Sequence, residues 1–129
     1  MKRLVSLFVL LLMLGGCASN PEAITFRCIS MHEAVDLMAQ EDNYIILDVR
    51  TQEEFSAGHI PNAICIPNET IGKEPIPLLP DKEQLILVYC RSGNRSKQAA
   101  NKLCLQGYTN IVEFGGILDW PGEIVTEAP

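Results

Sequence analysis

The sequence predicts a single α/β domain with a mostly parallel central sheet and helices on both faces. Three observations support this class. The runs YIILDV (44–49) and LILVYC (85–90) are almost continuously apolar, as in parallel strands buried on both faces. Helical patterns with capping signals alternate with strand-like runs along the chain. The length of 129 residues suits one domain with one core.

The N-terminal segment has the features of a secretion signal rather than of a folded domain. Two basic residues precede an apolar run that ends in Leu-Gly-Gly-Cys at 14–17. This ending resembles the lipobox of bacterial lipoprotein precursors, in which Cys17 becomes the acylated first residue. The expected organisation is a lipoprotein signal peptide at 1–16, a lipidated tether at 17–23 and a folded domain at 24–129.

The alternatives for this segment are an ordinary secretory signal and an uncleaved anchor helix. The apolar run is short for a permanent bilayer-spanning helix, and a cysteine directly after Leu-Gly-Gly favours a lipoprotein. The expected location is therefore extracytoplasmic, on a bacterial membrane to which Cys17 anchors the chain. Ala18 stands where an Asp would resemble an inner-membrane retention signal, which favours the outer membrane.

The first strand and helix of the domain are expected between residues 24 and 40. The stretch ITFRCIS (24–30) has apolar residues at alternate positions, which is typical of a strand. Ser30 and Glu33 have the spacing of a capping box, which predicts a helix that continues to about Gln40.

The strand at 44–49 is expected to lead into a short helix. Thr51 and Glu54 form a second capping-box pattern, so this helix should run to about Ala57. Gly58 follows it and is predicted to adopt the left-handed conformation that often ends a helix.

The second half of the domain continues the alternation. A short strand at 63–67 is followed by a proline-rich connection at 68–80, and the buried strand at 85–90 comes next. Arg95 or Ser96 should begin a helix that continues to about Gln106, with Gly107 as its left-handed end. A last strand is predicted at 110–114.

Charge and cysteine content exclude some classes of function. The formal net charge is -6, and loss of residues 1–16 would remove two further positive charges, which disfavours nucleic-acid binding. No close C-x-x-C spacing occurs, so a zinc site is not expected. The cysteines beyond Cys17 could pair in an oxidising compartment, and the sequence leaves open whether they do; they are Cys28, Cys65, Cys90 and Cys104.

Cys90 opens the segment CRSGNRS, between a buried strand and the next helix. Ligands in α/β sheets bind at this edge, where loop N–H groups and the helix dipole stabilise an anion and lower the pKa of a thiol. We expect Gly93 and Asn94 to supply positive φ angles, and Arg91 and Arg95 to supply positive charge. These neighbours favour a nucleophilic Cys90 over a cysteine that merely fills the core.

Three segments together resemble the single-domain rhodaneses, a family of sulfurtransferases. They are CRSGNRS, LDVRTQEEFSAGHIPNA (47–63) and FGGILDWPG (114–122), and the likeness extends from about Thr25 to Val125. The resemblance implies that Cys90 carries a sulfane sulfur as a persulfide. It also implies a small sulfur-containing donor such as thiosulfate, a thiol or cyanide as acceptor, and no metal or organic cofactor.

In this family the active loop runs from the cysteine to the arginine, which here are Cys90 and Arg95. The residues between them, which would bind the anion, are Arg91, Ser92, Gly93 and Asn94. Related cell-cycle phosphatases and arsenate reductases have a loop one residue longer that admits a tetrahedral oxyanion. The six-residue loop of this chain therefore favours sulfur transfer.

Other matched residues are expected to support the site. The pattern includes Asp48, Arg50 and Glu54, and we expect Arg50 to form a structural ion pair with Glu54 or Glu53. His59 is expected to make a local hydrogen bond that holds its loop. Asn62 stands where the family often has glycine, so a left-handed turn is predicted there.

A second function remains open from the residues alone. The chain could be an extracytoplasmic thiol redox or sulfur-binding module without turnover, in which Cys90 pairs with another thiol. Cys104, in the predicted helix after the loop, is the candidate partner, although burial as a packing residue is the more common fate of such a cysteine.

Overall fold

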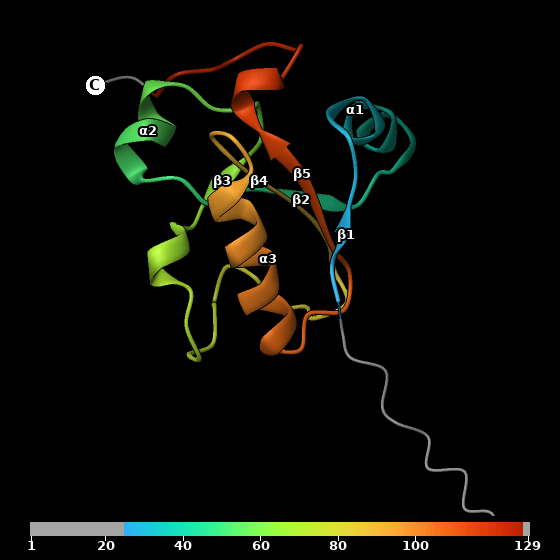
Figure 1. Cartoon of the computed structure of the whole chain (residues 1–129), viewed down its shortest axis with the longest axis vertical. Coiled ribbons are helices and arrows are strands. Elements are labelled where there is room, and N and C mark those ends of the chain that lie inside the picture. Colours follow the sequence, from blue (N-terminus) through green and yellow to red (C-terminus); the bar gives the residue numbers. More distant parts are fainter. Residues whose placement is uncertain (1–24, 128–129) are drawn as a thin grey trace, which may run out of the picture.

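The computed structural model describes residues 25–127, so the predicted signal peptide, Cys17 and the tether lie outside the described residues (Figure 1). The strands are β1 (Arg27–Cys28), β2 (Tyr44–Asp48), β3 (Ile64–Cys65), β4 (Leu85–Cys90) and β5 (Ile111–Gly116). The helices are α1 (Met31–Gln40), α2 (Gln52–Ala57) and α3 (Asn94–Leu105), with 3-10 turns η1 (Asn68–Thr70) and η2 (Ile117–Asp119). In the described part of the chain, no helix is both long and apolar enough to cross a bilayer.

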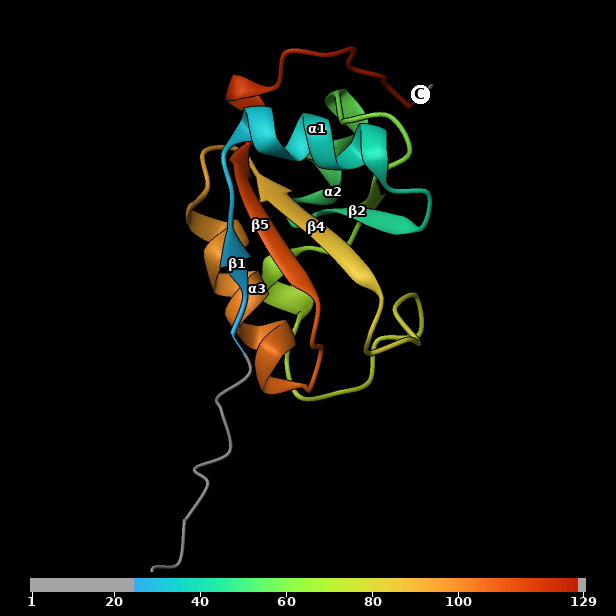
Figure 2. The same ribbon diagram turned by 90° about the vertical axis from the view of Figure 1, so that its right-hand side faces the viewer.

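The five strands form one sheet in the order β1-β5-β4-β2-β3, and every pairing in it is parallel. Figure 2 shows β1, β5, β4 and β2 side by side in this order. The two strands predicted to be buried on both faces, β2 and β4, occupy interior positions of the sheet. The predicted α/β class with a single domain is therefore confirmed.

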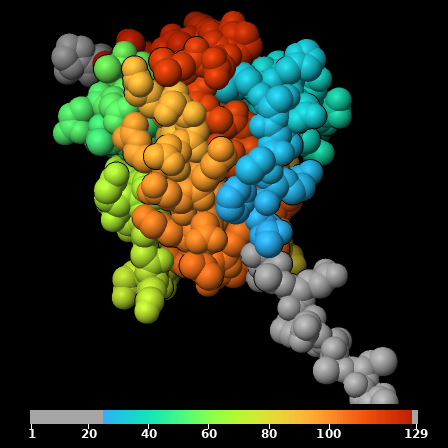
Figure 3. Space-filling model, in the orientation of Figure 1, coloured from blue at the N-terminus to red at the C-terminus, as the bar shows by residue number. Residues whose placement is uncertain are grey.

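The alternation of side chains along β4 divides the core into two layers. Ile86, Val88 and Cys90 face α3, together with the apolar residues of that helix. Leu87 and Tyr89 face the opposite side, where α1 and α2 contribute Ala34 and Phe55. Both faces of β4 are thus covered, which explains its uninterrupted apolar sequence. Figure 3 shows α3, in orange, covering the middle of its face of the molecule.

Both capping boxes predicted from the sequence are present. The Ser30 hydroxyl accepts a hydrogen bond from the Glu33 N–H at 3.1 Å, and the Ser30 N–H donates to the Glu33 carboxylate at 2.8 Å. Thr51 and Glu54 make the same reciprocal pair at the start of α2, at 3.2 and 3.4 Å. These bonds satisfy N–H groups that a helix start leaves without partners.

Several predicted helix and strand ends differ from the structure. Gly107 is left-handed after α3, with φ 97°, as expected, but α3 already begins at Asn94 and β5 extends to Gly116. The predicted left-handed Gly58 is wrong, because its φ of 164° is extended. The chain straightens there so that His59 can pair with Val125, and a Cβ at position 58 would lie 2.9 Å from Ile124 Cγ2.

The predicted pairing of Arg50 with Glu54 or Glu53 is also wrong. Arg50 pairs instead with the fully buried Asp48, with Nη2 2.7 Å from Oδ2 and Nε 3.0 Å from Oδ1. The same Nη2 donates to the Gly58 carbonyl at 2.7 Å. The guanidinium thereby joins the end of β2 to the end of α2.

Replacement of Asp48 by alanine should strongly destabilise the fold, since Arg50 would be left buried without a counter-ion. We expect a loss of about 3–5 kcal/mol in the free energy of unfolding measured by urea titration. Asp36→Ala is the matched control, because the Asp36 side chain is 57% exposed and its ion-pair partner, His32, lies on the same exposed helix surface. The control should change stability by less than about 0.5 kcal/mol. Equal losses in the two variants would contradict this role of Asp48.

Candidate active site

Cys90 is the last residue of β4, and the loop after it leads directly into α3 (Figure 1). The residue is only 1% exposed, whereas Arg91 and Ser92 on the outer side of the loop are exposed. The thiol therefore lies under the loop, at the carboxyl edge of the sheet where the sequence predicted the site.

The loop turns inward through Gly93, whose φ of 106° is left-handed, as predicted. Its N–H donates to Cys90 Sγ at 3.0 Å. The prediction of a positive φ for Asn94 is wrong, because Asn94 is already the first residue of α3. A single left-handed residue is sufficient to reverse the chain around the sulfur.

The surroundings of Cys90 stabilise its thiolate. Burial alone would raise the pKa of the Cys90 thiol. Hydrogen bonds from the Ser96 side chain, and then from the backbone of Ser96, Gly93 and Ser92, outweigh burial and bring this pKa below its ordinary value. The shift is in the direction that a nucleophilic cysteine requires.

Arg95 is held by a two-pronged ion pair with Glu54. Nη1 lies 2.7 Å from Oε1, and Nη2 lies 3.0 Å from Oε2. The bond from Arg95 is the main reason that the pKa of Glu54 falls to about 2, against a smaller opposing effect of burial. Of the two loop arginines, Arg95 is thus anchored to α2, and Arg91 is exposed.

Two residues that the sequence analysis did not assign to the site lie directly behind Cys90. The hydroxyl of Ser96 is 3.5 Å from Cys90 Sγ and 2.6 Å from Glu113 Oε1. Ser96 is fully buried, and Glu113 is 2% exposed. The available signal was a carboxylate within the otherwise apolar last strand, which is uncommon in a buried position.

Gly116 supports the loop from β5. It is paired with Cys90 in the sheet, and the backbone of Arg91 and Ser92 passes directly over it. A Cβ at position 116 would overlap the Arg91 carbonyl and the Ser92 Cα. The Arg91 carbonyl also accepts a hydrogen bond from the Leu118 N–H at 3.3 Å. Because Gly116 has no side chain, the backbone of the loop can lie close to β5.

His59 and Asn62 behave as predicted and lie outside the loop around Cys90. His59 Nδ1 is 2.8 Å from the Phe55 carbonyl, and its ring stacks on the Phe55 ring. Asn62 has a φ of 68°, the left-handed conformation expected of it. His59 is thus positioned by local contacts.

The cysteines of the described segment are all free thiols. Cys104 is buried in the α3 layer of the core, as the packing interpretation predicted, while Cys28 is exposed on β1. No group of side chains suited to a metal ion occurs within residues 25–127.

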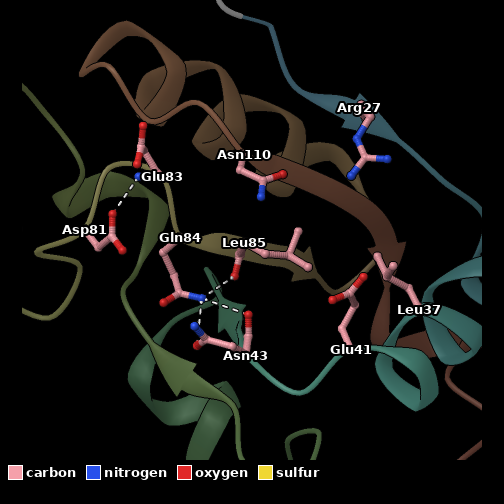
Figure 4. Close-up of a pocket in the computed structure, with 9 residues that line it drawn as sticks. All are labelled: Arg27, Leu37, Glu41, Asn43, Asp81, Glu83, Gln84, Leu85 and Asn110. Carbon is pink, nitrogen blue, oxygen red and sulfur yellow. Dashed lines mark hydrogen bonds between the residues drawn. The ribbon is translucent and has the colours of Figure 1, made fainter.

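Two surface hollows lie away from Cys90. One, of about 410 Å³, is at the amino ends of the strands and is lined by polar groups such as Arg27, Glu41 and Asp81 (Figure 4). The other, of about 510 Å³, is formed by α3 and the segment after η1, and Leu105 lies in its wall. Neither hollow is lined by a cysteine.

Comparison with known proteins gives a consistent picture. The family model of the rhodanese-like domain matches residues 30–123. The thiosulfate sulfurtransferase PspE of Escherichia coli (strain K12) is 36% identical over 73 residues, which cover 57% of this chain and 70% of PspE. A solved structure described as a rhodanese with anions from E. coli has a TM-score of 0.59 at 32% identity, covering 64% of this chain and 98% of that one.

Some relatives are much longer. The adenylyltransferase and sulfurtransferase UBA4 of Candida albicans is 32% identical over 122 residues, which cover 89% of this chain. The chain spans only 28% of the length of UBA4.

The Glu54–Arg95 pair should make stability depend on pH in the acid range. Because the pKa of Glu54 falls from 4.5 to about 2 in the folded chain, the contribution is complete above about pH 4.5 and is lost as the pH falls towards 2. The free energy of unfolding of the wild type should exceed that of Glu54→Gln by about 1 kcal/mol at neutral pH. This difference should vanish near pH 2.

Urea titrations across this pH range measure the difference, and Glu53→Gln removes the same charge from the neighbouring exposed residue as a control. A difference for Glu54→Gln that does not change with pH would contradict the ion pair.

Gly116→Ala should displace the loop, because the added methyl overlaps the loop backbone. We expect a stability loss of about 1–3 kcal/mol and a changed rate of Cys90 alkylation by iodoacetamide, followed by peptide mass analysis. Gly72→Ala is the control, since a Cβ there meets nothing within 4 Å. Unchanged alkylation in Gly116→Ala would show that the loop does not depend on this glycine.

Proposed function

The chain belongs to the rhodanese-like domain family, and on this premise we propose that it transfers sulfane sulfur through a persulfide on Cys90. The observation that carries the proposal is the buried Cys90 sulfur, 3.0 Å from the Gly93 N–H, with its pKa below the ordinary value. Relatives named as sulfurtransferases support sulfur transfer in general.

The reaction has two steps, with thiosulfate as the donor in an assay. The Cys90 thiolate attacks the outer sulfur of thiosulfate, the donor S–S bond breaks, and sulfite leaves with the electron pair. A thiolate or cyanide then attacks the outer sulfur of the persulfide, and Cys90 leaves as a thiolate. The sulfur itself is carried on the protein, so the cycle requires neither a metal nor an organic cofactor.

The loop provides a suitable place for the transferred sulfur. It has six residues from Cys90 to Arg95, which would leave room for one sulfur atom rather than for a tetrahedral oxyanion. Arg91 is exposed on its outer side and would attract an anionic donor. The similar rhodanese structure from E. coli is one with anions, which agrees with a fold that accepts negative charge.

The proposal includes an extracytoplasmic location, with Cys17 acylated and residues 17–23 as the tether. The described chain enters the sheet at the amino end of β1, whereas Cys90 lies at the carboxyl edge, and all strands are parallel (Figure 2). An anchor before β1 would therefore leave the Cys90 loop on the side of the domain away from the membrane, open to a soluble donor and acceptor.

An intact-mass measurement tests sulfur transfer. The soluble chain lacking residues 1–17 should gain one sulfur atom on incubation with thiosulfate and lose it on addition of cyanide. Cys90→Ala should show no gain. Cys104→Ala is the matched control and should load like wild type, because Cys104 is a packing residue of the core.

Other results would exclude the proposal. Loss of free thiols on mild oxidation without sulfur loading, abolished by Cys104→Ala, would indicate a redox module instead. Hydrolysis of an aryl phosphate without sulfur loading would indicate a phosphatase.

A further inference from the structure

A buried row of three side chains connects Cys90 to a carboxylate. Cys90 Sγ lies 3.5 Å from Ser96 Oγ, and Ser96 Oγ lies 2.6 Å from Glu113 Oε1. The three residues are 1%, 0% and 2% exposed, so water does not compete for these contacts. The row comes from β4, α3 and β5, which hold the groups in place.

The hydroxyl of Ser96 has one proton to donate and more than one acceptor near it. Glu113 Oε1 is the nearest of these, and the Gly115 carbonyl at 3.4 Å is a weaker one. A hydrogen bond to an ionised carboxylate is stronger than one to a neutral group. At rest the Ser96 proton therefore lies towards Glu113, and the lone pairs of Ser96 Oγ remain available to accept the thiol proton of Cys90.

The thiolate needs the opposite arrangement. Ser96 stabilises a Cys90 thiolate only when its proton turns to the sulfur, and Glu113 Oε1 then keeps only the bond from the Gly115 N–H at 2.9 Å. Loss of the Ser96 bond is costly for an ionised carboxylate in a buried site.

We propose that Glu113 is a positioning residue that acts through Ser96, such that Cys90 and Glu113 share one proton and the ionised carboxylate holds the resting sulfur as a thiol. This inference rests on the proposed role of Cys90 as the reactive thiol.

The transfer moves one proton and no electrons between the protein groups. The S–H bond of Cys90 breaks as a new O–H bond forms on Ser96, while the old Ser96 O–H bond breaks and an O–H bond forms on Glu113. The negative charge moves from the carboxylate to the sulfur. Ser96 now donates to the thiolate, which becomes ready to attack a donor.

Other charges face these groups from the surrounding elements. Arg95, at the start of α3, faces Cys90 and is paired with Glu54 of α2, and Arg91 lies on the exposed side of the loop. On the outer side of Glu113, Cys28 of β1 is its strand partner.

Burial raises the pKa of Cys28, as does its contact with Glu113, while Lys97 of α3 lowers it. None of these groups contacts Ser96 by a hydrogen bond, so within the described residues the Ser96 hydroxyl is the direct link between the thiol and the carboxyl.

At the proposed location outside the cytoplasm, this arrangement would protect the Cys90 thiol from oxidation. Thiolates are the form that peroxides oxidise, and a resting thiol is protected from this. Hydrogen bonds from the loop and the start of α3 lower the pKa of Cys90. On our proposal the bond from Ser96 to Glu113 limits this fall, because it holds the Ser96 proton away from the sulfur.

The test is the pH dependence of Cys90 alkylation by iodoacetamide in the full-length chain, followed by peptide mass analysis. This readout requires no sulfur transfer, so it can fail independently of the proposed function. Glu113→Gln keeps an oxygen acceptor for Ser96 and Gly115 but cannot ionise. We expect the midpoint of the alkylation profile to move to lower pH by about one unit. An unchanged or higher midpoint would overturn the proposal.

A second comparison isolates the part of Ser96. In a Ser96→Ala background the proton link is broken, so Glu113→Gln should produce a clearly smaller shift than in the wild-type background. An equal shift in both backgrounds would show that Glu113 acts by its field alone and would overturn the link through Ser96. Oxidation of Cys90 by hydrogen peroxide at neutral pH should be several-fold faster in Glu113→Gln, because more thiolate is present at rest.

Discussion

The irregular pairing of β4 with β5 is the constraint on which the site depends. Val88 is paired with Glu113, but Cys90 is paired with Gly116, so β5 has one residue more than β4 in this interval. The extra residue is accommodated at Gly115, whose φ of 97° is left-handed, and its N–H is bound by the Glu113 carboxylate. The bulge thus places Gly116 under the loop and the Glu113 carboxylate behind the Cys90 sulfur.

Two ion pairs near the site, one buried and one half-buried, hold different elements in place. Asp48 and Arg50 are close in sequence, and their pair fastens the end of β2 to Gly58. Glu54 remains free to reach 41 residues along the chain to Arg95. The first pair holds the scaffold beside the loop, and the second holds the start of α3, whose backbone surrounds the thiolate. Glu54 therefore fixes the position of the Arg95 guanidinium beside the loop.

What could be predicted from the sequence was local. The capping boxes at Ser30 and Thr51 join neighbours three residues apart, and the left-handed Gly93 and Asn62 follow from residue type and context. One error was local, since Asn94 begins α3 and has no positive φ. Two others depended on contacts between distant segments. Gly58 is extended because Val125 pairs with His59, and Glu54 finds Arg95 rather than the nearby Arg50, because Asp48 already satisfies that guanidinium. The spacing of residues along the chain does not show which of several possible partners a side chain will bind.

The role of Glu113 illustrates why a nucleophile and an anion can stand together in one buried site. A second negative charge beside a thiolate is unfavourable, so a site optimised only for thiolate would exclude a carboxylate. The loop supplies donors from Gly93 and from the start of α3, which favour the charged sulfur. The Ser96 hydroxyl favours the charged sulfur when it donates to Cys90, and the protonated sulfur when its proton lies towards Glu113. Both effects depend on whether the Ser96 hydroxyl donates its proton to Cys90 or to Glu113. The direction of that one hydrogen bond therefore decides whether the sulfur or the carboxylate is stabilised.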